Sequence, residues 1–275
     1  MDMITLTPEK LRLLQLRQLD MLRFFKDFCE KNDITFYLFG GGLIGALRHG
    51  GFIPWDDDVD VILKRPDYER LCALWKEQDP SERFRLLRTD GEVFTGNTFA
   101  TLTDTKYRMV KANQVDYDIP RGLVLDIFPL DACPNGSFAR KVQMLWAMIY
   151  SLFQAQIVPE NHGGVLGFGS RLLLGIFRGK RVRERLWRLA ERKMTKYRFE
   201  DCDCLTELCA GPHWMRIKFP KRIYEGVAHV SFEGIELPCM SGYEEYLATV
   251  FGDYMQLPPE EDRRPHHEIV ELELE

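Results

Sequence analysis

The stretch that decides the fold is FGGGLIGALRHGGFIPWDDDVD, residues 39–60. A β-branched and aromatic run at 35–39 leads into it and predicts a short strand that stops at the three glycines of 40–42. Residues 43–48 then have the apolar spacing of one or two helical turns. The expected order is therefore strand, glycine turn and helix, followed by a loop and an acidic segment.

The acidic segment contains Asp56, Asp57, Asp58 and Asp60. In an extended chain alternate side chains point the same way, so we expect Asp56, Asp58 and Asp60 to share one face. Three carboxylates on one face repel one another unless a divalent cation lies among them, and such oxygen ligands suit Mg²⁺ or Mn²⁺. A solvated acidic turn is the alternative. The apolar residues that continue the segment to Leu63 predict a buried strand and favour the metal site.

The glycines and the end of the following helix offer groups for an anion. Gly41 and Gly42 allow the backbone to approach a phosphate closely, and amides at the start of a helix favour negative charge. Arg48 and His49 follow at the end of this turn. A tight turn packed beneath a helix explains the glycines equally well, because the stretch matches neither the P-loop nor the GxGxxG pattern. The acidic segment 14 residues later favours the phosphate interpretation.

Glycine turn, short helix and alternating aspartates together resemble the polymerase-beta-like nucleotidyltransferase fold. Residues 39–60 closely resemble the signature of the LicD family, which includes bacterial phosphocholine transferases and, more distantly, the fukutin-related ribitol-phosphate transferases. Further segments resemble that family in the same order: LDIFPLD at 125–131, residues 246–254, LPPE at 257–260, and His266-His267. The resemblance covers the core and the C-terminal end, and nothing in 138–225 carries it.

The resemblance implies transfer of a phospho-alcohol, typically phosphocholine from CDP-choline, to a hydroxyl of a cell-surface polysaccharide or teichoic acid precursor, releasing CMP. It makes Asp58, Asp60 and Asp126 the catalytic carboxylates and, with Asp56, the Mg²⁺ ligands. The alternative is a nucleotidyltransferase that moves NMP from an NTP to a small molecule or protein, and the motif does not separate the two. A non-catalytic nucleotide-binding relative is disfavoured by the intact aspartates.

Phosphoryl transfer depends mainly on positioning and charge neutralisation. We expect Gly41 and Gly42 to cradle the diphosphate and Arg48 to neutralise the leaving CMP. Asp126 is the candidate base for the acceptor hydroxyl. Lys106 is a further phosphate candidate, although a surface lysine is the simpler interpretation.

Histidines and aromatic residues supply further candidates. His266 and His267 fall where LicD-like sequences carry histidines near the active site, which implies a substrate contact, and a flexible polar tail is the rival interpretation. A choline ammonium is bound by aromatic rings. The sequence does not single out one ring among Trp55, Tyr107, Tyr117 and Trp214.

Seven cysteines, an odd number, lie mostly within apolar or helical patterns. This indicates free thiols in a reducing compartment, and the N-terminus lacks the basic start of a secretory signal, so we expect a cytoplasmic protein. Cys202, Cys204, Cys209 and His213 offer four zinc ligands, but their spacing matches no standard zinc module. Buried thiols are the default interpretation there.

The composition limits the possible protein class and domain organisation. A chain of 275 residues, 45% apolar with a net charge of −5, is a globular protein of one or two domains and not a general nucleic-acid binder. We expect an α+β class with a mixed-sheet core flanked by helices: a catalytic core at 1–135, a helical and partly basic region at 136–225, and a C-terminal segment at 226–275 that returns to the active site. The predicted helices are 8–32, 65–78 and 243–251, and the predicted strands are 84–88, 99–103, 107–110, 123–128 and 228–237.

Charge is concentrated in one segment of the helical region. Residues 171–196 carry ten basic and two acidic side chains, a net charge of +8, which leaves the rest of the chain at −13. Interspersed leucines and aromatic residues fit a helix that lies on an anionic lipid surface, near a lipid-linked acceptor at the inner membrane face. A solvated helix that pairs with the acidic core is the alternative.

Overall fold

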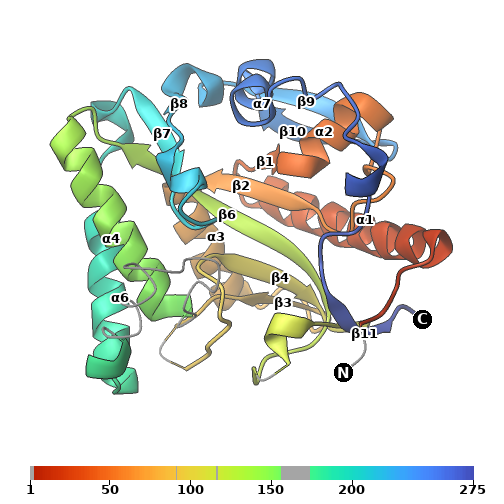
Figure 1. Cartoon of the computed structure of the whole chain (residues 1–275), viewed down its shortest axis with the longest axis horizontal. Helices are drawn as coiled ribbons and strands as arrows, with labels where there is room; N and C mark the ends of the chain where they lie inside the picture. Colours follow the sequence, from red (N-terminus) through yellow and green to blue (C-terminus); the bar gives the residue numbers. More distant parts are fainter. Residues whose placement is uncertain (1–2, 91, 116, 156–173) are drawn as a thin grey trace.

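The computed structural model describes residues 3–90, 92–115, 117–155 and 174–275 (Figure 1). A seven-stranded sheet lies at its centre, in the order β1-β2-β6-β4-β3, with β7 pairing both β6 and β8. Its strands are β1 (Tyr37–Phe39), β2 (Asp60–Lys64), β3 (Phe84–Leu87), β4 (Ala100–Asp104), β6 (Leu123–Cys133), β7 (Cys204–Glu207) and β8 (Phe219–Pro220). Strands β2 and β6 are parallel and the other pairs are antiparallel, which confirms the α+β class.

Strand β6 is longer than the predicted 123–128, and Pro129 explains how. Its residues 123–127 pair with β4, and residues 130–133 pair with β7. Pro129 falls between the two partners, where a residue without an N–H costs no hydrogen bond on that side. One continuous strand therefore joins the catalytic region to β7 and β8. The predicted boundaries between regions at residues 136 and 226 stay a prediction. Strands β7 and β8 belong to the predicted middle region, 136–225, yet they are part of the central sheet.

Helix α1 (Pro8–Lys31) begins as the sequence predicts, with the Thr7 hydroxyl accepting a hydrogen bond from the Lys10 amide at 3.3 Å. Helix α3 (Arg65–Gln78) follows β2 directly. Helix α2 (Gly40–His49) begins immediately after β1, so the expected glycine turn is wrong. The three glycines form the first turn of α2 itself. The strand switches to helix at Gly40, whose φ of +55° strongly favours glycine.

Helices α4 (Ser137–Ala155) and α6 (Lys180–Met194) lie side by side at one edge of the molecule (Figure 1). They share an apolar cluster that includes Ala147, Tyr150 and Trp187. The glycine-rich stretch 162–169, and the first three residues of the basic segment 171–196, lie outside the described residues. No helix in the described ranges has the length and apolar character needed to cross a membrane.

Residues 227–275 pack against β1, α2 and β5 (Arg108–Lys111). The strand predicted at 228–237 is wrong: the chain forms a hairpin of β9 (Val227–Phe232) and β10 (Ile235–Met240), because Glu233 and Gly234 take positive φ values of 49° and 77°. Helix α7 (Tyr243–Phe251) follows. The last strand, β11 (Ile269–Glu273), pairs with β5, so the chain end lies against the core.

Candidate active site

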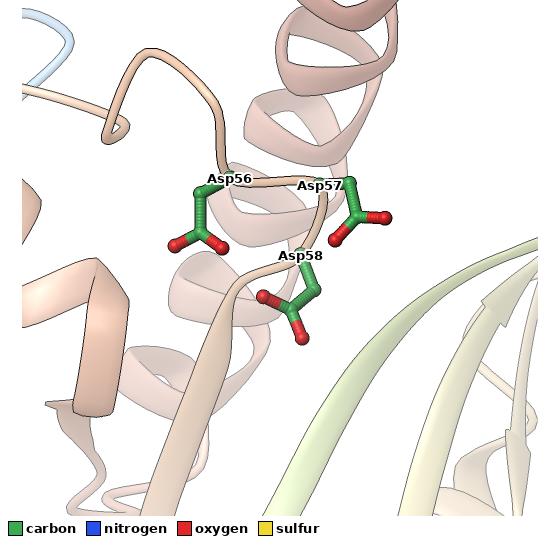
Figure 2. Close-up of side chains that lie close together, drawn as sticks. All are labelled: Asp56, Asp57 and Asp58. Carbon is green, nitrogen blue, oxygen red and sulfur yellow. The ribbon is translucent and has the colours of Figure 1, made fainter. Parts of the chain in front are cut away.

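The acidic segment brings its carboxylates together in a loop. Strand β2 begins at Asp60, so residues 56–59 precede the strand. Carboxylate oxygens of Asp56, Asp57 and Asp58 lie within 4.8 Å of one another (Figure 2), and this is the one group of three such ligands within the described ranges. The prediction that alternate aspartates lie on one face holds in part. Asp56 and Asp58 lie together, but Asp57 joins them and Asp60 is outside the group.

The charges in this cluster are crowded. Burial raises the pKa of Asp56 to about 8, and the negative charges of Asp58 and Asp57 add to the effect. Burial also raises the pKa of Asp60 well above its usual range, as do the charges of Asp58 and Asp126. Carboxylates that are buried together resist ionisation. A divalent cation among them would favour their charged forms, so this cluster is a suitable site for one.

Asp126 stands beside Asp60 in the sheet. The two residues are register partners on the parallel strands β6 and β2. The Thr101 hydroxyl, from β4, donates a hydrogen bond to Asp126 Oδ1 at 3.3 Å. The adjacent strands thus bring Asp60 and Asp126 together, and the charge of Asp126 acts to raise the pKa values of both Asp58 and Asp60.

Gly41 is in close contact with the acidic loop. A Cβ atom at this position would lie 2.6 Å from Asp56 Oδ2, whereas one at Gly42 would lie 3.0 Å from a Leu38 methyl group. Gly41 lines the cavity described below, and Gly42 packs beneath it. Close packing of α2 against Asp56 therefore explains Gly41, and packing against Leu38 and Val59 explains Gly42.

Two glutamines of α1 hold the acidic loop from below. Gln15 Nε2 donates to the carbonyl oxygens of Ile53 at 3.1 Å and Asp56 at 2.9 Å. Gln18 Nε2 donates to the Asp57 carbonyl at 2.9 Å. Both side chains are buried, so they fix the backbone of a segment that has no strand partner. The sequence analysis missed them, although two amides on the apolar face of an amphipathic helix are a readable signal.

The C-terminal segment contacts Asp57. The backbone amides of His266 and His267 donate to its carboxylate at 3.3 and 3.1 Å, and His267 Nδ1 lies 3.0 Å from Asp57 Oδ1. These contacts hold the pKa of Asp57 below its usual value despite burial. His267 Nε2 is also 3.8 Å from Asp58 Oδ2. The predicted histidines therefore lie at the acidic cluster, and the flexible-tail alternative is wrong.

A cavity of about 650 Å³ opens over Asp56 and Asp58. Its other walls come from α2, from Trp55 and from the segment 251–266. Of the four aromatic residues proposed as choline contacts, Trp55 is the one that lines it. The acidic cluster thus faces a space large enough for a small ligand.

Two arginines flank Trp55 beside this cavity. The Cζ atoms of Arg48 and Arg263 lie 5.9 and 5.7 Å from the centroid of the Trp55 ring. Arg48 donates to the carbonyls of Tyr254 and Gln256 at 3.0 and 3.1 Å, and Arg263 donates to the Pro258 carbonyl at 2.9 Å. Neither guanidinium lies within 4.0 Å of a carboxylate in the described parts of the chain. Burial and the charge of Arg263 lower the pKa of Arg48, which lines the cavity.

Two other predicted site residues, His49 and Lys106, lie in different places. Arg48 Nε donates to His49 Nε2 at 3.0 Å, so His49 adjoins the arginine pair. Lys106 lies in the turn after β4, with its ammonium 5.1 Å from the Tyr107 ring, and does not line the cavity. Lys111, which the sequence analysis missed, is buried on β5, and its charge acts to lower the pKa values of Asp58 and Asp60.

No zinc-type group forms from Cys202, Cys204, Cys209 and His213, all of which the structure describes.

A mixed sheet with paired carboxylates on neighbouring strands, next to a helix whose glycines contact them, defines the class of nucleotidyltransferase-like folds. Residues 33–162 match the family model described as LicD/FKTN/FKRP, nucleotidyltransferase domain. The chain is 30% identical over 265 residues to the lipopolysaccharide cholinephosphotransferase LicD of Haemophilus influenzae, across 94% of this chain and 96% of that protein. It is 46% identical over 39 residues to human ribitol 5-phosphate transferase FKRP, across 14% of this chain and 8% of that protein. The chain therefore belongs to the LicD family.

Proposed function

We propose that this protein transfers a phospho-alcohol, phosphocholine in the first place, from a CDP-alcohol to a hydroxyl of a lipopolysaccharide or other cell-surface glycan, releasing CMP. The observation that carries the proposal is one cavity lined by the carboxylates of Asp56 and Asp58 and by Arg48, with Arg263 against the same Trp55 ring as Arg48. The near full-length similarity to a cholinephosphotransferase supports the choice of substrate.

Magnesium or manganese fits the carboxylates that line the cavity. Asp56 and Asp58 would hold the ion, with Asp60 and Asp126 beside them, and the bound ion supplies neutralisation of the diphosphate charge. Asp57 has a different task, because its oxygens already accept hydrogen bonds from His266 and His267. It positions the C-terminal segment, and with it one wall of the cavity.

The two arginines beside Trp55 would bind the anionic part of the donor. Arg48 and Arg263 have carbonyl partners, which fix their positions while leaving their charges uncompensated. A guanidinium binds phosphate oxygens in a forked geometry, so this pair suits a diphosphate or the departing CMP.

In the proposed reaction the acceptor oxygen forms a bond to the phosphorus that carries the alcohol. The bond between this phosphorus and the bridging oxygen breaks, and the bridging oxygen leaves with CMP. Asp126 would accept the proton of the acceptor hydroxyl. Its position beside Asp60 supports this role, because it is a partly exposed carboxylate next to the crowded cluster.

The test is turnover of purified protein with lipopolysaccharide, Mg²⁺ and one donor at a time: CDP-choline, CDP-ribitol, CDP-glycerol, ATP or CTP. Release of CMP with transfer of the labelled alcohol phosphate to the glycan is expected for a CDP-alcohol, and EDTA should abolish it. The Asp58→Asn variant should lose at least about 10³-fold in rate, since metal-ion catalysis contributes several kcal/mol. Release of pyrophosphate with transfer of NMP from ATP or CTP would establish the nucleotidyltransferase alternative instead.

A further inference from the structure

Helix α4 exposes an apolar stripe. Phe138, Leu145 and Met148 are exposed to 79%, 51% and 40%, and their spacing places them on one side of the helix. Lys141 lies among them and is also exposed. The helix contains no acidic residue. The side that faces solvent is therefore apolar and weakly basic, which is unusual for a helix at the edge of a globular protein.

Helix α6 exposes a basic stripe. Its exposed side chains include Arg181, Arg185, Arg188 and Arg192, which recur at helical spacing. The two acidic residues of α6 are engaged with arginines: Glu184 with Arg188 at 2.9 Å, and Glu191 with Arg88 at 2.6 Å. Positive charge therefore dominates the outer side of this helix.

The helices that carry the two stripes pack against each other. The helices are antiparallel neighbours, because the Tyr197 hydroxyl, just past α6, contacts the Ala139 carbonyl near the start of α4 at 3.4 Å. Gln143 Nε2 donates to the Met194 carbonyl at 2.9 Å. Their buried sides, with Tyr150 and Trp187, meet in a common apolar cluster. Each exposed stripe lies on the side of its helix opposite the buried one, and the two helices are neighbours at the edge of the molecule seen in Figure 1.

We propose that α4 and α6 dock the protein on an anionic lipid bilayer. Apolar side chains of α4 would enter the headgroup region, while the arginines of α6 contact lipid phosphates. Charge complementarity commits the surface to this occupant. A second copy of the chain would present the same positive charge and be repelled, and nucleic acid offers nothing for three exposed apolar side chains. Docking would bring the enzyme to acceptors attached to lipid.

The experiment is co-sedimentation of the full chain with vesicles at 0.1 M NaCl, using phosphatidylcholine alone or with one-third phosphatidylglycerol. We expect binding to the anionic vesicles, weak binding to neutral ones, and release as NaCl is raised. Arg181→Gln with Arg185→Gln should lower the partition coefficient about 25-fold, since each basic side chain near such a surface contributes about fivefold. Phe138→Ser with Leu145→Ser should also weaken binding.

The matched control is Lys10→Gln with Lys76→Gln, which removes the same charge from exposed positions on α1 and α3 and should leave binding unchanged. Equal loss in the control and in the α6 variant would overturn the proposal, as would equal binding to neutral vesicles. Sedimentation without vesicles, or stronger binding to duplex DNA than to anionic vesicles, would assign the surface to another partner. Because binding is the readout, loss of transferase activity and loss of docking are distinguishable.

Discussion

Three consecutive aspartates have different roles because their neighbours differ. Asp57 is surrounded by donors from the C-terminal segment, which keep its pKa low. Asp56 is buried beside Asp58, and burial together with the charges of Asp58 and Asp57 raises its pKa to about 8, although a hydrogen bond from the Asp57 backbone acts in the opposite direction. One carboxylate therefore stabilises the fold in its charged form, while burial keeps the pKa values of the other two raised, even though His267 and Lys111 act to lower that of Asp58. This difference is what separates a structural aspartate from the candidate metal ligands in a single run of sequence.

Gly41 offers a test of how closely α2 must approach the cluster. In Gly41→Ala the new methyl group would lie 2.6 Å from Asp56 Oδ2, and the end of that side chain can move away. We expect a loss of about 10²-fold in kcat, as for a displacement of about 1 Å in a reacting group. Stability should change by less than about 1 kcal/mol, because alanine favours helix. Both are checked by CMP release and urea unfolding.

The control for this variant is Gly45→Ala on the same helix. Its methyl group would lie 2.3 Å from the Gly51 carbonyl oxygen, which belongs to the backbone and cannot rotate away. Gly45→Ala should therefore lower the free energy of unfolding, by about 1–3 kcal/mol. Equal destabilisation by the two variants would contradict the role given to Gly41.

Arg263 tests the positive charge beside Trp55. Arg263→Gln keeps a donor for the Pro258 carbonyl but removes the charge beside Trp55. We expect KM for the CDP-alcohol to rise about 10-fold to 100-fold, because a hydrogen bond to a charged group contributes about 1.5–3 kcal/mol. Thermal stability should stay the same. The neighbouring exposed Arg264→Gln is the charge-matched control, and an equal effect there would mean that only the overall field matters.

At the scale of elements, the start of α3 is tied to β6 by a buried ion pair. Arg65 donates to both oxygens of Asp131 at 2.9 and 2.7 Å, and Asp131 is 1% exposed. Arg65→Met leaves this carboxylate buried without a partner, and we expect the free energy of unfolding to fall by about 3–5 kcal/mol. Denaturant titration at pH 7 measures the change.

The double variant Arg65→Met/Asp131→Leu separates the pair from its parts. Replacing both charges with apolar groups of similar size removes the unpaired carboxylate, so most of the lost stability should return. A double variant as unstable as Arg65→Met alone would show that the guanidinium contributes through its other contacts, such as Glu69 at 3.3 Å.

The elements that the sequence predicts well have local signals. Helix α1 has its Thr7 cap and Pro8, and α7 spans the predicted 243–251. The errors occur where partners decide the structure. The length of β6 depends on β7, some 70 residues later in the chain, and the hairpin at Glu233 depends on a backbone conformation that apolar patterning does not report.

The candidate site also has some features that the local sequence predicts and others that depend on distant parts of the chain. Alternation predicted that Asp56 and Asp58 lie together, although the segment is a loop held by Gln15 and Gln18 and not a strand. The role of Asp57 and the approach of Lys111 depend on the C-terminal segment and on β5. No local pattern places these near residue 58, because each contact spans more than 50 positions.

At the scale of the whole molecule, the site is assembled from distant parts of the chain. Helix α1 supports the loop, α2 and residues 53–58 form the floor of the cavity, and residues 254–267 close it. Strand β11 then fastens the chain end to β5, with Ile269 2% exposed and its carbonyl accepting from the Ile4 amide at 2.7 Å. A ligand in the cavity therefore contacts segments that come together only in the folded protein.

Binding of donor and metal should consequently stabilise the entire fold. With Mg²⁺ present and CDP-choline at a hundred times its Kd, linkage predicts about 2.7 kcal/mol of added stability, a rise of about 5–10 °C in Tm. Differential scanning fluorimetry with Mg²⁺ alone, CDP-choline alone and both together measures it, and the combination should exceed the sum because the carboxylates repel the diphosphate until the cation is present. Asp58→Asn should not show the combined shift, whereas the α6 variant Arg181→Gln/Arg185→Gln should keep it in full. A shift of equal size in Asp58→Asn would place donor binding away from the acidic cluster.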